Sequence, residues 1–159
     1  MAARRFPNRL TLAEFFDQHL PRVISDNIIA DHYLDLNGFK PVNDKHGHIG
    51  GDELLFAVGK RLRRAIRETD MVARLGRDEF AIVQIDMSNP EEAHALSWRI
   101  RDTIDQPFEI DQLSISVSAS IGTAINAEPF ACLSEMLDQA DSELYRVKRA
   151  MKRLQLVAV

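Results

Sequence analysis

The sequence predicts a single α+β domain with a ferredoxin-like core, in which helices flank a central antiparallel or mixed sheet. Three observations lead to this fold class: segments with apolar residues at helical spacing, one segment that alternates apolar residues with serines, and two short apolar runs separated by the turn-forming sequence GRDE. In chain order the segments give helix, strand, helix, hairpin, helix, strand, helix and strand. Strand–helix units that enclose a hairpin are typical of that core.

Four segments show helical periodicity. Their apolar residues recur every three or four positions, as on the buried face of an amphipathic helix. In the third segment, Pro90 stands at the start and acidic residues follow in the first turn, both of which favour a helix there. The predicted helices span residues 11–24 (interrupted near Pro21), 52–67, 90–106 and 130–152. The glycine- and asparagine-rich segment 38–51 is expected to be a loop or a short helix.

The strands are marked by short apolar runs. The predicted strands span residues 28–36, 71–75, 80–85, 113–121 and 154–159. The fourth is the clearest, because its apolar residues alternate with serines at the period of a sheet with one buried face. Asp31 and His32 lie inside the first strand, where burial without partners would cost a few kcal/mol. We therefore expect them to pair with each other or to face the open side of the sheet.

Composition limits the class of protein. The chain has 159 residues, 45% of them apolar and 28% charged, which is ordinary for one globular domain. Twenty basic and 24 acidic side chains give a net charge of −4, which disfavours a nucleic-acid binder because a phosphate backbone demands positive charge. The single cysteine, Cys132, excludes an internal disulfide. Without a secretory signal or a membrane-length apolar run, we expect a cytoplasmic domain that makes no membrane contact, or the cytoplasmic domain of a membrane-anchored parent.

Acidic residues occur at two turns that this topology brings together. Asp35 lies near the end of the first strand, and Asp78 and Glu79 lie at the hairpin turn. If the hairpin is beside the first strand, these carboxylates converge at one edge of the sheet. Hard oxygen ligands at adjacent strand ends are what Mg²⁺ uses when it also holds a nucleotide phosphate. The alternative is that acidic residues occupy turns simply because they are solvated there.

Six segments resemble motifs of one family and follow that family's order. They are FPNR at 6–9, DLNGFKPVND at 35–44, HGHIGGD at 46–52, RLGRDEF at 74–80, SASIG at 118–122, and the pattern AD, LY and K within 140–148. Together they resemble the GGDEF domain family, the diguanylate cyclases, over nearly the whole chain. The resemblance implies a polymerase-palm or nucleotidyl cyclase-like fold. It also implies that residues 1–159 are a single GGDEF-type domain from a larger multidomain signalling protein.

The resemblance implies a metal site and a catalytic acid. Asp35, the backbone carbonyl of Leu36 and Asp78 match the family's ligands for Mg²⁺, with Mn²⁺ as an alternative ion. Asp78 and Glu79 match the acidic residues to which the family assigns the chemistry.

The resemblance also implies a GTP site. The matching positions are Asn43, Asp52, Lys40, Lys148, Gly76 and Arg77. An amide at Asn43 and a carboxylate at Asp52 can satisfy the acceptors and donors of guanine. Lys40 and Lys148 match positions that contact the triphosphate. Without the family, Asp52 reads as the N-cap of the following helix and Lys148 as part of a solvated basic helix end.

Arg67 and Asp70 form an RxxD pattern that ends six residues before Gly76. This matches the family's product-inhibition site in sequence and offset, which implies cyclic di-GMP binding. Arg67 would present a planar fork to a phosphate or a guanine face, and Asp70 would accept from guanine. The alternative is a helix-terminal arginine followed by a turn aspartate.

The signature departs from the family at Arg77, which replaces its second glycine. Paired glycines let the backbone approach the phosphates, so a long side chain is expected to obstruct that approach. If the turn needs a positive φ, arginine also adds a backbone cost. After Lys148, the sequence Met151-Lys152-Arg153 stands where the family has Gly-Arg-Asn.

The resemblance therefore implies a domain of cyclic di-GMP signalling that binds GTP, cyclic di-GMP or both, with weak or lost cyclase activity. The family reaction joins two GTP into cyclic di-GMP and two pyrophosphates, with Mg²⁺ as Lewis acid, and requires a homodimer that holds one GTP in each subunit. Sensor or phosphodiesterase domains are the expected neighbours. Two alternatives remain: an active diguanylate cyclase that tolerates the variant signature, and a structural or dimerisation domain without nucleotide binding.

Overall fold

The computed structural model describes residues 6–19, 28–126 and 132–158. The helices are α1 (Arg9–His19), α2 (Phe39–Ala65), α3 (Glu91–Asp105) and α4 (Leu133–Val157), and the strands are β1 (Ile28–Asn37), β2 (Met71–Arg74), β3 (Glu79–Met87), β4 (Phe108–Ile110), β5 (Leu113–Ile115) and β6 (Ser118–Asn126). A four-stranded sheet has the order β2-β3-β1-β6, with antiparallel neighbours, and β4 pairs with β5 separately. The predicted α+β, ferredoxin-like class is confirmed.

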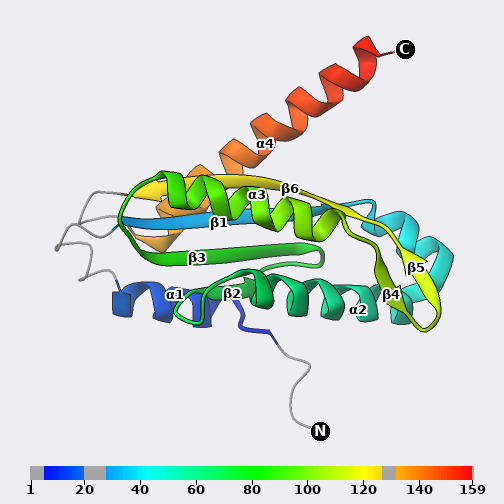
Figure 1. Cartoon of the computed structure of the whole chain (residues 1–159), viewed down its shortest axis with the longest axis horizontal. Coiled ribbons are helices and arrows are strands. Elements are labelled where there is room, and N and C mark those ends of the chain that lie inside the picture. The colour runs from blue at the N-terminus through cyan, green and yellow to red at the C-terminus, as the bar shows by residue number, and fades with distance from the viewer. Residues whose placement is uncertain (1–5, 20–27, 127–131, 159) are drawn as a thin grey trace, which may run out of the picture.

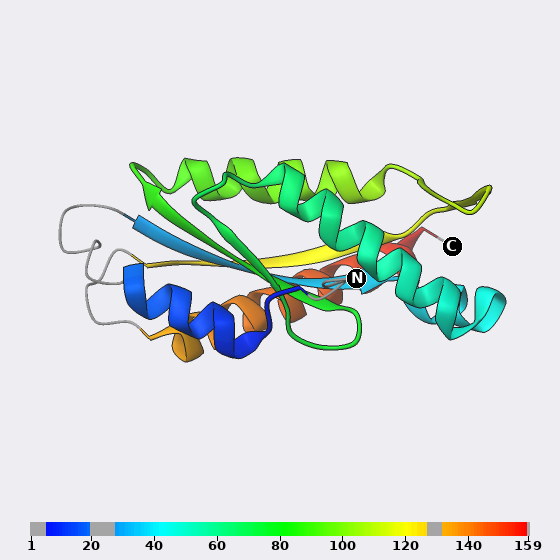
Figure 2. The same ribbon diagram turned by 90° about the horizontal axis from the view of Figure 1, so that it is seen from below.

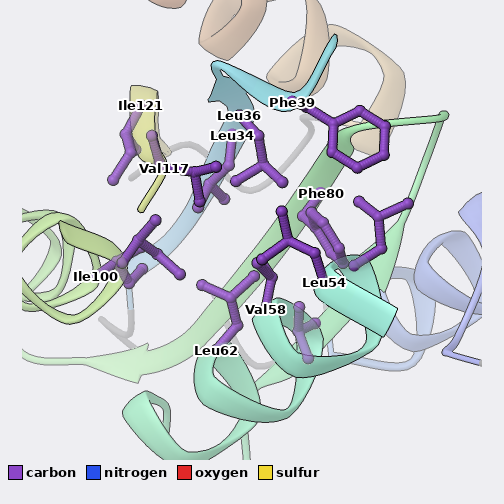
Figure 3. Close-up of a cluster of buried hydrophobic side chains, with 14 of the residues drawn as sticks. Leu34, Leu36, Phe39, Leu54, Val58, Leu62, Phe80, Ile100, Val117 and Ile121 are labelled. Atoms are coloured by element: carbon purple, nitrogen blue, oxygen red, sulfur yellow. The ribbon is translucent and has the colours of Figure 1, made fainter. Parts of the chain in front are cut away.

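Helices cover both faces of the sheet. Helices α2 and α3 lie on one face, and α1 and α4 lie on the other (Figure 2). The two layers follow from the alternation along β1, because Leu34 and Leu36 pack into the α2/α3 cluster whereas Ile29 and Tyr33 pack into the α1/α4 cluster. In Figure 3, Leu54 of α2 and Phe80 of β3 meet in the first of these clusters.

Of the two alternatives for segment 38–51, a loop or a short helix, the structure shows the helix. It forms the first part of α2, which breaks at Gly47 (φ 72°, ψ 175°) and then continues to Ala65. A positive φ of this kind carries no steric cost for glycine. Asp52 therefore lies inside the helix, several residues after the break, and its interpretation as an N-cap is wrong.

The predicted strand 113–121 is divided in two. Leu113–Ile115 is β5, whereas the residues from Ser118 onward form β6, which extends to Asn126. Asp111 (φ 46°) and Gln112 (φ 67°) both have positive φ and form the two-residue turn between β4 and β5. The sequence signal for this hairpin is weak because glycine and asparagine, the usual residues of such a turn, are absent. Arg61 of α2 anchors the hairpin by stacking on Phe108 of β4.

The prediction of a last strand at 154–159 is wrong. Helix α4 continues through this segment to Val157, and its final turns project away from the sheet (Figure 1). Leu154, Leu156 and Val157 are exposed there, so their strand-like spacing reflects no buried sheet face. The N-terminal end of this helix as predicted, at residue 130, and the interruption near Pro21 lie outside the described residues.

Helix α4 packs directly on the backbone of β6. A Cβ at Gly122 would lie 1.9 Å from the carbonyl oxygen of Ala140 and 2.4 Å from the backbone nitrogen of Leu144. The strand therefore needs glycine here for close approach.

Asp31 and His32 are both fully buried, and they face opposite sides of the sheet instead of pairing. His32 contacts Ser97 of α3 (3.1 Å), Thr123 of β6 (3.0 Å) and Gln84 of β3 (3.0 Å) through its ring nitrogens. Among the described residues, neither carboxylate oxygen of Asp31 has a hydrogen-bond partner. Burial raises the pKa of Asp31 to about 8, and burial lowers the pKa of His32 to about 4.

The unpaired carboxyl group predicts a pH-dependent stability. Between about pH 4 and pH 8 the folded protein keeps a proton on Asp31 that the unfolded chain releases, so this group's stabilising contribution is lost as the pH rises. We expect the free energy of unfolding of Asp31→Asn, relative to that of the parent, to rise between about pH 5 and pH 8, at up to about 1.4 kcal/mol per pH unit. Urea unfolding of both proteins measures this difference. His32 contributes in the opposite direction, favouring stability as the pH rises, but it is present in both proteins and its contribution cancels in the comparison. Parallel plots of unfolding free energy against pH for the two proteins would contradict the expectation.

Candidate functional site

The pairing of β1 with β3 brings the predicted acidic residues together. Asp35 stands directly opposite Glu79, and the backbone N–H of Leu36 donates to the carbonyl oxygen of Asp78 at 3.1 Å. All three acids thus lie where β1 ends and β3 begins.

The side chain of Arg74 holds the turn by hydrogen bonds to its backbone carbonyls. Arg74 donates from Nε to the carbonyl oxygen of Gly76 (3.0 Å) and from Nη2 to the carbonyl oxygen of Arg77 (2.8 Å). A Cβ at Gly76 would lie 2.4 Å from Oε2 of Glu79, so a larger residue at this position would require the Glu79 carboxylate to shift. Arg77 does not have a positive φ. The backbone cost considered for arginine at this position therefore does not apply. The signature differs from the family here only in carrying an exposed side chain.

A pocket of about 370 Å³ opens between this turn and the first part of α2. Its lining includes Lys40, Asn43 and His48 from α2, together with Arg77 and Asp78 from the turn. With Asp44, which also lines it, the pocket combines an amide, two carboxylates and two cationic side chains, which are suitable partners for a base and a phosphate group.

The two residues implied to read guanine are neighbours around Gly51 but line different pockets. A Cβ at Gly51 would lie 1.8 Å from Oδ1 of Asn43, so the carboxamide packs against this glycine. Asp52 is exposed and lines a separate pocket of about 260 Å³ with Phe6 and Arg74.

The two predicted triphosphate lysines approach from opposite faces of the sheet. Lys40 belongs to α2, whereas Lys148 belongs to α4 and forms an ion pair with Oδ2 of Asp35. Beside Lys148, a cavity of about 540 Å³ is lined by Lys152, Asn37 and Ser118. The interpretation of Lys148 as a purely solvated helix-end residue is therefore incomplete, because its side chain reaches Asp35 of the candidate site.

The donor set suits a hard cation. Asp35 and Asp78 supply carboxylate oxygens and Leu36 supplies a carbonyl oxygen, the ligand types that Mg²⁺ prefers. Within the described parts of the chain, no three Asp, Glu, His or Cys side chains converge closely enough to hold a metal ion by themselves. Mg²⁺ is commonly bound by one or two carboxylates with nucleotide phosphates as the remaining ligands, and the residues present fit that mode.

Arg67 and Asp70 lie at the opposite end of β3 from the acidic turn. Asp70 is buried, and its carboxylate accepts from the backbone N–H groups of Arg67 (3.1 Å) and Ile85 (3.1 Å). Burial raises the pKa of Asp70. The half-exposed guanidinium of Arg67 pairs with Glu92 of α3 at 2.6 Å. Arg67 is therefore available at the surface, whereas Asp70 already supports the fold.

One residue of the site, Tyr33, is not singled out by the sequence motifs. It is 8% exposed and lies on the same face of the sheet as Glu79, diagonally across the β1–β3 pair. Burial, followed by the nearby charges of Glu79 and Asp141, raises the pKa of Tyr33 to about 12. The available signal was its position two residues before Asp35, which places both side chains on the same face of β1.

Comparison with known proteins identifies relatives across the chain. The family model described as diguanylate cyclase, GGDEF domain, matches residues 4–153. The chain is 37% identical over 145 residues to the bifunctional diguanylate cyclase/cyclic di-GMP phosphodiesterase MucR of Pseudomonas aeruginosa, covering 91% of this chain and 21% of MucR. It is 33% identical to the diguanylate cyclase TpbB of the same species, covering 90% of this chain and 33% of TpbB. The chain thus spans a third or less of the length of these relatives.

Solved structures agree with this assignment. A sensory box/GGDEF family protein from Caulobacter crescentus CB15 superimposes with a TM-score of 0.82 at 31% identity, covering 91% of this chain and 94% of that one. The GGDEF domain of TpbB gives a TM-score of 0.83 at 30% identity, covering 91% and 86% of the two chains. Among the described residues, no helix has the length and apolarity that a membrane span requires. By its motifs, its fold and these matches, the chain belongs to the GGDEF domain family.

Proposed function

We propose that this GGDEF domain acts in cyclic di-GMP signalling as a guanine-nucleotide-binding regulatory module with weak or no cyclase activity. The pocket shared by Lys40, Asn43, Arg77 and Asp78 carries the proposal. It retains the groups that suit a nucleotide, yet an arginine lines it at the turn where the family has glycine.

Each group has a distinct part in binding. Asn43 and Asp52 read the guanine edge, and Lys40 and Lys148 neutralise the phosphates from the two faces of the sheet. The guanidinium of Arg77 attracts phosphate oxygens because it is a planar multiple donor. The same side chain fills space at the turn, so the phosphates sit farther from the backbone than in a protein with two glycines.

Asp35, Asp78 and the carbonyl of Leu36 hold Mg²⁺ in this proposal, or Mn²⁺ in its place. When bound, such an ion supplies Lewis acidity and neutralises phosphate charge. Catalysis in the family also needs a second domain that faces the first. Displacement of the phosphates by Arg77 misplaces the α-phosphate relative to the 3′-hydroxyl of the partner GTP, so binding survives better than turnover.

The names of the relatives support a proposal about the larger protein to which this domain belongs. MucR is named as a bifunctional diguanylate cyclase and phosphodiesterase, and NbdA of the same species, 34% identical over 142 residues, as a cyclic di-GMP phosphodiesterase. We propose that this domain likewise belongs to a larger cytoplasmic or membrane-anchored protein with sensor or phosphodiesterase domains.

An active diguanylate cyclase is the second candidate. The observation that favours it is the backbone at Arg77, which has no positive φ and so does not require glycine. Retention of Asp35, Asp78 and Glu79 at the adjoining strand ends agrees with it.

Substitution of Arg77 distinguishes a regulatory module with little cyclase activity from an active diguanylate cyclase. With the domain fused to a dimerising segment, we expect little cyclic di-GMP from GTP and Mg²⁺, and at least about tenfold more from Arg77→Gly, the gain that about 1.4 kcal/mol of transition-state stabilisation provides. Because the φ of residue 77 suits any side chain, Arg77→Ala should recover activity nearly as well. Chromatography of the products provides the measurement. Robust synthesis by the parent would instead establish the active cyclase.

Base recognition is tested by nucleotide titration. We expect Mg²⁺-dependent binding of GTP and clearly weaker binding of ATP, because a carboxylate that faces the N1 and N2 donors of guanine would face an acceptor of adenine. Asp52→Ala should remove the preference. Calorimetry with both nucleotides, with and without Mg²⁺, measures it. If the parent binds neither nucleotide at millimolar concentration, the regulatory proposal fails; if it binds both equally, the assignment of Asp52 is wrong.

Cyclic di-GMP binding is tested at Arg67. Removal of a charge-assisted contact by Arg67→Ala should weaken binding by about 1.5–3 kcal/mol, roughly ten- to a hundredfold. Arg64→Ala, an exposed arginine of α2, is the matched control and should leave the affinity unchanged. Asp70 is unsuitable for this purpose because its carboxylate binds two backbone N–H groups. Equal calorimetric affinities of the parent and Arg67→Ala would show that Arg67 is only a helix-end residue.

A further inference from the structure

Three arginines around the C-terminal end of α2 have guanidinium groups that contact other parts of the protein. Arg63 donates to the backbone carbonyl oxygen of Arg67 at 3.0 Å, and Arg99 of α3 donates to that of Ala65 at 2.8 Å. Arg67 instead donates to a carboxylate oxygen, Oε2 of Glu92, at 2.6 Å. Of these three guanidinium groups, that of Arg67 therefore has a charged side chain as its partner, which an anionic ligand can replace.

The backbone of Arg67 is fixed by the buried carboxylate of Asp70. This carboxylate accepts from the backbone N–H groups of Arg67 and of Ile85 in β3, each at 3.1 Å. The side chain of Arg67 is 50% exposed. The guanidinium thus extends from a fixed point at the surface, where it can contact either Glu92 or a ligand.

Glu92 is held by contacts that do not involve Arg67. Its backbone N–H donates to Oδ1 of Asn89 at 3.2 Å, and its Oε1 accepts from the backbone N–H of Ser88 at 2.9 Å. These reciprocal contacts resemble a capping box at the start of α3. From the sheet, Gln84 of β3 donates to the carbonyl oxygen of Glu92 at 3.4 Å. The carboxylate therefore stays close to Arg67 even when the guanidinium turns away.

This arrangement places a fixed negative charge at the predicted site for cyclic di-GMP. The N–H of Ser88 and the guanidinium of Arg67 both lower the pKa of Glu92, which is therefore ionised at neutral pH. A phosphodiester is also an anion, so it competes with Glu92 for the same guanidinium donors. An exposed ion pair is weak enough for a ligand to displace, but the displacement lowers the ligand's affinity.

We propose that Glu92 is an internal competitor for the guanidinium of Arg67, so that cyclic di-GMP binds at Arg67 only by displacing this carboxylate. The inference rests on the proposed binding of cyclic di-GMP and deepens it by naming a residue that limits its affinity. Glu92 lies outside the six family-like segments and outside the RxxD pattern. The apparent affinity falls with the fraction of the protein in which Arg67 is free, so the domain responds at a higher ligand concentration.

Calorimetric titration of the whole domain with cyclic di-GMP at fixed ionic strength tests the proposal. Glu92→Gln removes the charge and keeps an oxygen that can accept from Ser88, because glutamine also serves at this position of a capping box. We expect it to bind about threefold to tenfold more tightly than the parent, as when a hydrogen bond of ordinary net strength no longer competes. Glu91→Gln changes the same charge at the adjacent, exposed residue and should leave the affinity nearly unchanged.

Two further measurements show whether the gain acts through Arg67. In the double variant Arg67→Ala/Glu92→Gln, the affinity should be no higher than in Arg67→Ala. Without any ligand, phenylglyoxal should modify Arg67 faster in Glu92→Gln than in the parent, as followed by mass spectrometry of peptides, whereas the exposed Arg64 should react equally in both. An unchanged affinity in Glu92→Gln, an equal gain in Glu91→Gln, or a gain that persists in the double variant would overturn the proposal.

The outcome is separable from that of the proposed function. If cyclic di-GMP binds and Arg67→Ala weakens the binding, but Glu92→Gln brings no gain, the role of Glu92 is wrong and the binding site stands. If neither the parent nor Glu92→Gln binds cyclic di-GMP, the role of Glu92 is overturned together with the assignment of Arg67. Titration with GTP then still decides whether the separate pocket beside Asp78 binds nucleotide.

Discussion

The register of β1 against its two neighbours is the constraint on which the site depends. Asp35 is opposite Glu79 on one side and Ser120 on the other, so a single pairing fixes both the acidic turn and the start of β6. A slip by one residue would turn Asp35 to the other face and bring Leu34 and Leu36 out of the α2/α3 core. The hydrophobic core therefore specifies the geometry of the carboxylates without contacting a ligand.

Much of this fold was predictable because its signals are local or motif-based. The β2–β3 hairpin, α3 and the position of β1 follow from periodicity and turn sequence, and the six family-like segments supplied the fold class. The errors occurred where tertiary packing overrides local pattern. The apolar residues after Arg153 alternate like a strand but continue a helix that leaves the sheet. The serine-rich strand divides after Ile115 because its first part pairs with β4 and only its second part joins β1.

The candidate site was predictable as a set of positions but not as a set of contacts. Motif matching placed Asp35, Asp78 and Glu79 at adjoining strand ends, and the register does bring them together. It could not show that Lys148 pairs with Asp35, because this contact joins residues from separate elements. The expected strain at Arg77 depended on a φ angle that the residue type does not reveal. Asp35 and Lys148 are thus partners of each other, and a ligand of either must compete with that ion pair.

The close approach of α4 to β6 at Gly122 has a consequence for how the two halves of the site are joined. Leu144, whose backbone nitrogen lies over this glycine, stands one helical turn before Lys148. The height of α4 above the sheet thus sets how far Lys148 must reach to Asp35, and that height is fixed by the absence of one methyl group. Lys148 thus lies between the contact at Gly122 and the C-terminal turns of α4, which project beyond the sheet (Figure 1).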